Sequence, residues 1–112
     1  MGYDLHITRK EHWSDEDGSE ISLSEWVKYS QNDSDIKPDP DNPGDENWMI
    51  ISDSWSWPIW WEKNGELRTK NPEPAAIQKL ISIAIALDAR VLGDDGEIYR
   101  NDSSGAVTLG ST

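Results

Sequence analysis

The sequence predicts an α+β fold, in which an antiparallel sheet of about five strands packs against one long apolar helix, with one short helix near an edge. Short alternating or aromatic-rich stretches bounded by turn residues predict the strands. One stretch, 75–89, is apolar on nearly all sides with helical spacing. A chain of 112 residues is long enough for one core and too short for two. We therefore expect a compact domain over 1–99, followed by a loosely ordered polar tail over 100–112.

The first elements follow from local patterns. Tyr3 to Thr8 alternates apolar and polar residues, which predicts a half-buried strand. His6 falls on its polar face, where a lone histidine is usually solvated or hydrogen-bonded. Residues 9–20 are polar, and we expect Trp13 to tuck back from them onto the core. Ser22 and Glu25 form the S-x-x-E capping box, which predicts a short helix over 23–30.

Residues 31–46 read as a long exposed acidic loop. They contain three prolines, and Ile36 is their one apolar residue. A calcium-binding register that starts at Asp39 is broken by Pro43 and by Ile50, which stands where a bidentate glutamate is required. We therefore predict no metal site here.

The stretch 47–61 holds five of the seven tryptophans. Aromatic and β-branched residues at this density favour a mostly buried, pleated surface. Two interpretations remain open. The indoles form the core of a domain that lacks phenylalanine, or Trp55 and Trp57 stay near the surface as contact anchors.

The second half of the chain predicts two hairpins around a helix. Asn64-Gly65 is a hairpin turn that pairs 60–62 with 67–69. Two prolines at 72 and 74 suit the first turn of a helix over 75–89. Strands over 91–92 and 97–99 flank the turn at 93–96, and one weak strand is expected over 106–109.

Charge narrows the class of partner. The net charge is −12; residues 1–62 carry 15 acidic and 4 basic side chains, and residues 63–112 carry 7 and 6. This one-sided acidic field repels nucleic acid and anionic membranes and attracts basic partners, although acidic surface also simply aids solubility. The chain lacks cysteine, a signal-peptide pattern and a long apolar run, so we expect a cytoplasmic protein without disulfides or thiolate metal sites.

No pattern predicts catalysis. The many carboxylates raise the possibility of a glycosidase, but they cluster in turns and loops. Asp94-Asp95-Gly96 is turn chemistry, no glycine loop for phosphate is present, and neither His6 nor His12 has a supporting motif. We therefore predict a binding protein with no catalytic residue and no cofactor.

Four segments resemble a family of small acidic bacterial proteins. They are MGYDLHITR over 1–9, the capping box before Trp26, NGELRTKNPEP over 64–74 and ALDARVLGDDGEIY over 86–99. Some members are associated with the immunity proteins of bacterial toxin–immunity pairs, such as those of contact-dependent growth inhibition. The acidic loop and the tail have no counterpart in the resemblance.

The resemblance implies an immunity protein whose partner is a cognate toxin domain, the C-terminal part of a large secreted bacterial protein. Many such domains are basic nucleases, and acidic and aromatic side chains complement their clefts. The candidate toxin-binding residues are Asp39, Asp41, Asp45 and Glu46 of the acidic loop, with Asp53, Trp55 and Trp57 expected to lie adjacent to it. Asp15, Glu16 and Asp17 are the second choice. The alternatives are a carbohydrate-binding module that uses exposed tryptophans and an adaptor whose acidic surface only keeps it in solution.

Overall fold

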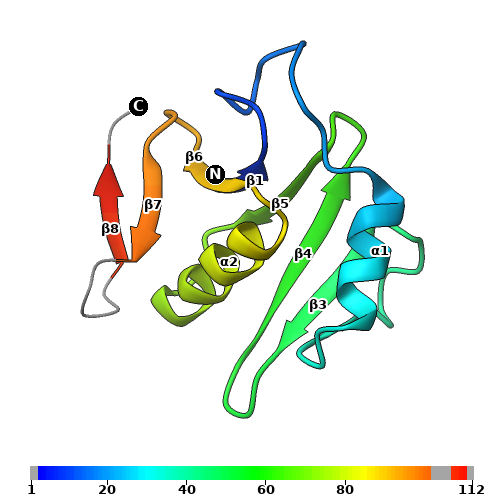
Figure 1. The fold of residues 1–112 in the computed structure, drawn as a ribbon. Helices are drawn as coiled ribbons and strands as arrows, with labels where there is room; N and C mark the ends of the chain where they lie inside the picture. The colour runs from blue at the N-terminus through cyan, green and yellow to red at the C-terminus, as the bar shows by residue number, and fades with distance from the viewer. Residues whose placement is uncertain (1–2, 102–106, 111–112) are drawn as a thin grey trace.

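The computed structural model describes residues 3–101 and 107–110, which form an antiparallel sheet and two helices (Figure 1). The eight strands are ordered β2-β3-β4-β5-β1-β6-β7-β8. They span Asp4–Thr8 (β1), Ile36–Pro38 (β2), Asn47–Ile51 (β3), Ser56–Glu62 (β4), Glu66–Lys70 (β5), Arg90–Gly93 (β6), Ile98–Asn101 (β7) and Val107–Gly110 (β8). The helices are α1 (Leu23–Gln31) and α2 (Pro74–Ala86). The predicted α+β class and antiparallel sheet are confirmed.

The expected strand number of about five is wrong. One extra strand, β2, lies inside the segment predicted to be a loop, because Ile36 is buried and pairs with Ile50 of β3. Another, β8, comes from the expected polar tail, close to the weak strand predicted over 106–109, and pairs with β7. The residues at 102–106 and 111–112 of that tail lie outside the described residues.

The second helix is also shorter than expected. It has 13 residues and ends at Ala86, and the chain turns at Leu87 and at Asp88, whose φ is +55°. The helix is not covered on more than one side, since Ile85 is 73% exposed. Its buried residues form a single stripe at helical spacing, namely Ala76, Leu80, Ile81, Ile83 and Ala84.

The first helix agrees with its local sequence signal. The Ser22 side chain accepts from the Glu25 amide, and the Glu25 side chain accepts from the Ser22 amide, so the predicted capping box is present. Trp26 is fully buried and meets Trp48 of β3 edge-on, with ring centroids 5.9 Å apart. This contact places α1 over the β3 end of the sheet.

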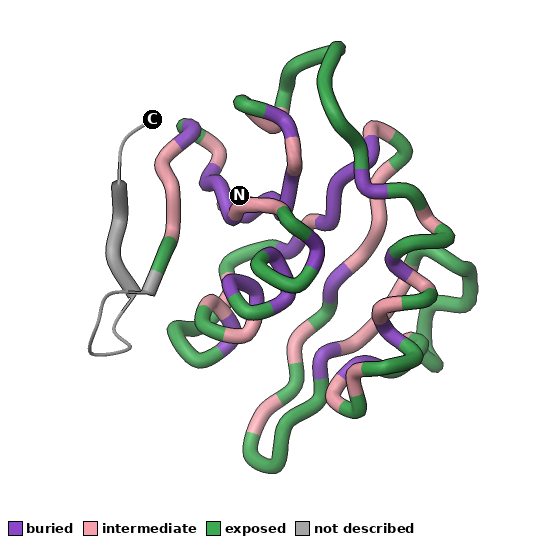
Figure 2. Tube along the Cα trace, in the orientation of Figure 1, coloured by how far each residue is buried: buried purple, intermediate pink, exposed green. Residues whose placement is uncertain are grey.

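Both helices cover the same face of the sheet (Figure 1). Leu5 and Ile7 of β1, Ile50 of β3, Ile59 of β4 and Leu67 of β5 belong to the core cluster beneath them. β1 is buried on both faces from Leu5 to Thr8, whereas β4 has Ile59 as its one buried residue, and the connecting loops are mostly exposed (Figure 2). Within the described chain, neither helix has the length and apolar character of a membrane span.

Candidate binding face

The face of the sheet opposite the helices carries the side chains that alternate with the core residues. On β3 and β4, these include Met49, Ile51, Pro58 and Trp60. Met49 pairs directly with Pro58, and Ile51 is 45% exposed. We call these four residues the open-face strip. Their apolar side chains sit where nothing in the described chain fully buries them.

The neighbouring strands of the same face hold a buried polar cluster around His6. Of the two states expected for His6, solvated or hydrogen-bonded, the structure shows the second, since its side chain is hydrogen-bonded and only 1% exposed. Its Nδ1 meets Glu66 Oε2, its Nε2 lies 2.8 Å from Asp94 Oδ1, and its ring stacks on Trp13. The side of β1 that carries His6 is polar, as the alternation predicted, but the segment 9–20 covers it.

Each ring nitrogen of His6 has a carboxylate as its partner. Burial opposes the charge of Glu66, but hydrogen bonds from His6, Asn64 and Arg68 outweigh it and hold the pKa of Glu66 below its ordinary value. The pKa of Asp94 is lowered too, since bonds from the Asp4 amide and His6 outweigh burial.

This cluster has the composition of a catalytic site but no access for a substrate. His6 and Glu66 are each 1% exposed, and Trp13 lies over the imidazole with its indole N–H donated to the Asp94 carbonyl at 3.2 Å. Trp13 does fold back, as expected, although it packs on His6 and not on the helix-covered core. We interpret the role of the cluster as structural: it holds the segment 9–20 against the sheet.

The acidic loop, defined here as residues 39–46, joins β2 to β3. Asp41, Asp45 and Glu46 are exposed, and none of the loop carboxylates forms an ion pair within the described chain. Asp39 has a different role: its carboxylate accepts from Asn42 Nδ2 and the Asp41 amide, which lowers its pKa and shapes the turn. The loop is anchored because the Trp48 indole donates to the Asp45 carbonyl at 2.7 Å.

The other predicted contact residues do not lie beside this loop. Asp53 is exposed in the turn after β3, so the five residues of β3 separate it from the acidic loop by roughly 16 Å. Trp55 packs against the core cluster, and the Trp57 indole donates to the Lys70 carbonyl at 3.0 Å. The expectation that these three residues adjoin the acidic loop is therefore wrong.

The second-choice residues lie elsewhere again. Asp15, Glu16 and Asp17 are exposed in the segment 9–20. The Asp15 carboxylate accepts from the His12 amide at 3.1 Å, and its carbonyl accepts from the Lys10 ammonium. They form a separate acidic group beside Trp13.

The open-face strip links the two acidic ends of β3. The acidic loop precedes this strand and Asp53 follows it, so carboxylates border the strip at both ends. Sequence reasoning missed the four apolar residues as a surface. The signal was present in the alternation of Asn47, Met49 and Ile51 against Trp48 and Ile50, which leaves one apolar set on each face.

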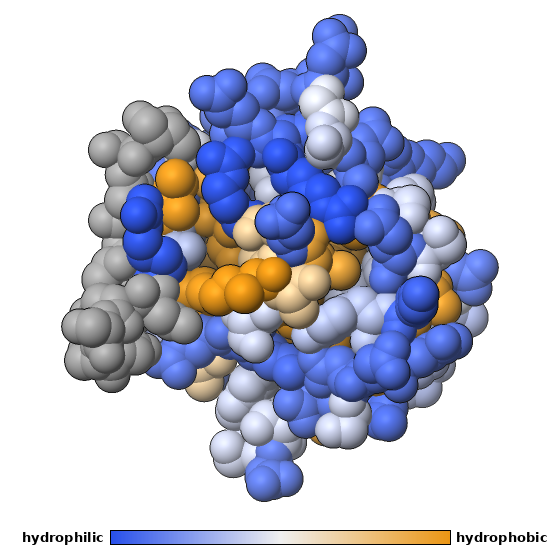
Figure 3. Space-filling model, viewed as in Figure 1, coloured by the Kyte–Doolittle hydropathy of each residue, from blue (hydrophilic) through white to orange (hydrophobic). Residues whose placement is uncertain are grey.

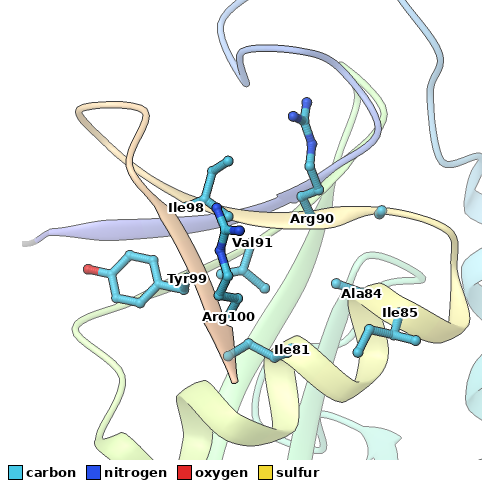
Figure 4. Close-up of a pocket in the computed structure, with 9 residues that line it drawn as sticks. Ile81, Ala84, Ile85, Arg90, Val91, Ile98, Tyr99 and Arg100 are labelled. Carbon is cyan, nitrogen blue, oxygen red and sulfur yellow. The ribbon is translucent and has the colours of Figure 1, made fainter. Parts of the chain in front are cut away.

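A second apolar region lies on the helix side. Figure 3 shows apolar side chains gathered over α2 within a polar surround. Ile81, Ala84 and Ile85 of α2 line a depression of about 370 Å³ against Val91 of β6, with Arg100 of β7 at its edge (Figure 4). Its polar lining residues are Arg90, Tyr99 and Arg100, and none of the predicted contact residues lines it.

In the described part of the chain, no three acidic or histidine side chains are grouped so as to hold a metal ion. Comparison of the chain with protein-family models, with curated proteins and with solved structures finds no match.

Proposed function

We propose that this protein binds and neutralises a basic protein partner, docking through the open-face strip and the acidic loop. The observation that supports this best is an exposed apolar strip on a sheet face, bordered by carboxylates that have no ion-pair partner in the described chain. Specific interfaces combine a water-excluding apolar centre with a polar rim. An acidic rim speeds encounter with a basic partner and disfavours acidic ones.

The resemblance suggests which partner this is. If the chain is an immunity protein, the partner is a toxin domain, and a basic nuclease fits the charge of −12. The carboxylates of the acidic loop would then lie where the toxin binds phosphates. The segments that carry the resemblance contribute His6, Glu66 and Asp94 to the buried cluster, so the resemblance concerns the scaffold, and the partner is a matter for the exposed face.

The carbohydrate-binding alternative requires a row of exposed indoles. All seven tryptophans are described, and each is buried or half-buried. Five of them donate their indole N–H within the protein, namely Trp13, Trp48, Trp57, Trp60 and Trp61. This favours a protein partner. An adaptor with a merely solubilising surface would have no need of the open-face strip.

The test is capture of the partner. The protein is used as bait in its own bacterium and is co-expressed with the open reading frame immediately upstream. We expect a stoichiometric complex with the C-terminal domain of a large secreted protein and protection of growth against that domain. Failure of that domain to bind, together with unchanged growth, would overturn the proposal.

A further inference from the structure

A depression of about 480 Å³ opens on the binding face where the acidic loop meets the turn between β4 and β5. Its lining residues come from both segments and the strands beside them, and the ones used here are Glu46, Trp60, Glu62, Lys63, Asn64 and Arg68. We propose that this depression is a socket for one arginine side chain of the protein partner. The inference deepens the proposed function and rests on it for the bearer of the arginine.

An aromatic surface forms part of the socket. Trp60 is half-buried, and its indole N–H donates to Glu62 Oε1 at 2.9 Å. That bond occupies the polar edge of the ring, so a ligand meets its apolar surface. Indole is the best aromatic partner for a cation, and guanidinium groups stack on it.

One acceptor is available at the rim. Glu46 is exposed and has no ion pair within the described residues. Asn64 lies in the wall, where its Nδ2 donates to Glu66 Oε1 at 2.6 Å, and because that carboxylate only accepts, the amide cannot turn over. Its Oδ1 is an acceptor that is buried without a hydrogen-bond partner in the described chain.

The two cationic side chains that line the depression form no ion pair with Glu46. Arg68 pairs with Glu66 at 3.3 Å and with Glu62 at 3.6 Å, so its charge is matched inside the protein. Lys63 is exposed in the hairpin turn and forms no ion pair in the described chain. The lining therefore carries two carboxylates and two cations, and Glu46 is the carboxylate that has no ion pair in the described chain.

A guanidinium fits this set better than an ammonium does. It is planar, it carries five N–H donors in a fixed geometry, and it is less strongly hydrated than an ammonium. It can lie on Trp60 while it donates to the exposed carboxylate of Glu46. A neutral sugar could also stack on the indole, but it would leave the charge of Glu46 unmatched.

The test uses three small probes with the full-length protein: Nα-acetyl-L-arginine amide, its neutral analogue Nα-acetyl-L-citrulline amide, and methyl β-glucoside. Binding is followed by NMR at the Trp60 indole N–H, which is assigned with Trp60→Phe. We expect a saturable shift with the arginine probe and an affinity at least about fivefold lower for citrulline.

The matched variants are Glu46→Gln and Asp53→Asn, because both remove one exposed carboxylate at opposite ends of β3. We expect Glu46→Gln to weaken the arginine probe at least about fivefold and Asp53→Asn to change it less than about twofold. Equal effects of the two variants would show that the arginine probe responds only to the overall negative charge of the protein, and this would overturn the socket. Equal binding of citrulline, or stronger binding of the glucoside, would overturn it as well.

The two proposals fail separately. A captured partner with no arginine-probe binding would remove the socket and leave the binding role. A saturable arginine site with no partner and no growth protection would remove the proposed function and keep the socket as a site for free guanidinium compounds.

Discussion

His6 and Trp13 stack face to face, with ring centroids 4.1 Å apart and planes 3° from parallel. The indole also lies under the Arg68 guanidinium carbon, 5.8 Å from the ring centroid. Trp13 is therefore held by the His6 ring, by the Arg68 guanidinium and by its bond to the Asp94 carbonyl. It is the residue that joins the segment 9–20 to the face of β1.

Replacement of Trp13 by alanine should destabilise the fold by about 2–4 kcal/mol, since it removes a large aromatic contact and opens the buried cluster to water. The measurement is urea unfolding followed by circular dichroism. Trp13→Phe keeps a ring over His6 and should recover part of the loss. A Trp13→Ala variant as stable as the parent would show that the stack contributes nothing.

The buried cluster predicts how stability depends on pH. The pKa of Glu66 is lowered from its ordinary value of 4.5, so its contribution is complete above about pH 4.5 and is lost as pH falls through the lower folded value. Glu66→Gln should cost about 3 kcal/mol at pH 7, because it leaves His6 with one carboxylate.

The difference between Glu66→Gln and the parent should narrow as the pH falls below about 4.5, where Glu66 of the parent takes up its proton. Unfolding free energies measured from pH 7 to pH 3 test this. Glu73→Gln removes an exposed carboxylate that makes no cap bond and serves as control. A constant difference across the pH range would contradict the assignment.

Local signals predicted the elements whose causes are local. Ser22 and Glu25 are three residues apart, and Asn64-Gly65 lies inside its own hairpin, so the capping box and the hairpin were both predicted, although residues 60–62 pair with 66–68 and not with 67–69. The partners of His6 were not predicted, because Glu66 and Asp94 are 60 and 88 residues away along the chain. No alternation pattern contains that information.

The same distinction explains the site. Composition located the acidic loop, since charge and proline content are visible in the sequence. Which tryptophans pack on the core depends on the pairing of β3 with β4, where Trp57 lies opposite Ile50 and Trp60 opposite Asn47. That register places Trp60 on the open face and Trp57 on the face of Ile50, and a tryptophan-rich stretch alone does not fix it.

Arg9 predicts a second stability effect, because it joins both helices. Its Nε donates to the Leu87 carbonyl at 2.9 Å, and Nη1 and Nη2 donate to the Glu25 carboxylate at 3.1 and 2.7 Å. The bonds from Arg9 to the Glu25 carboxylate, together with a smaller contribution from the Ser22 amide, lower the pKa of Glu25 to about 2.

Arg9→Ala should therefore raise the pKa of Glu25 towards its ordinary value and reduce stability by about 1–3 kcal/mol. NMR titration of the Glu25 carboxyl and urea unfolding provide the two readouts. Arg9→Lys keeps the charge but loses the paired geometry. Its stability and its Glu25 pKa should therefore lie between those of the parent and those of Arg9→Ala. An unshifted Glu25 in Arg9→Ala would mean that the pair is absent in solution.

Reversal of charge in the acidic loop should slow association with the captured partner. The variant changes Asp39, Asp41, Asp45 and Glu46 to lysine, and we expect the association rate to fall at least about tenfold at low salt, with a smaller effect at high salt. Stopped-flow kinetics at two salt concentrations measure it. The control reverses the charges of Asp15, Glu16 and Asp17. If the association rate fell equally in this variant, the overall charge of the protein, and not the acidic loop, would determine that rate.

The open-face strip predicts a loss of affinity without a loss of fold. Ile51 and Ile85 are both exposed isoleucines, but Ile51 lies on the helix-free face and Ile85 lies on α2. Ile51→Gln should weaken binding of the captured partner at least about tenfold, because it places an amide in the apolar centre of the interface.

Ile85→Gln is the matched control and should change that affinity less than about twofold, since α2 covers the other face of the sheet. Calorimetry gives both affinities, and unfolding curves check that each variant keeps its fold. If Ile85→Gln weakened binding and Ile51→Gln did not, the partner would dock on the apolar surface over α2. The carboxylates that border β3 would then act only through their long-range field.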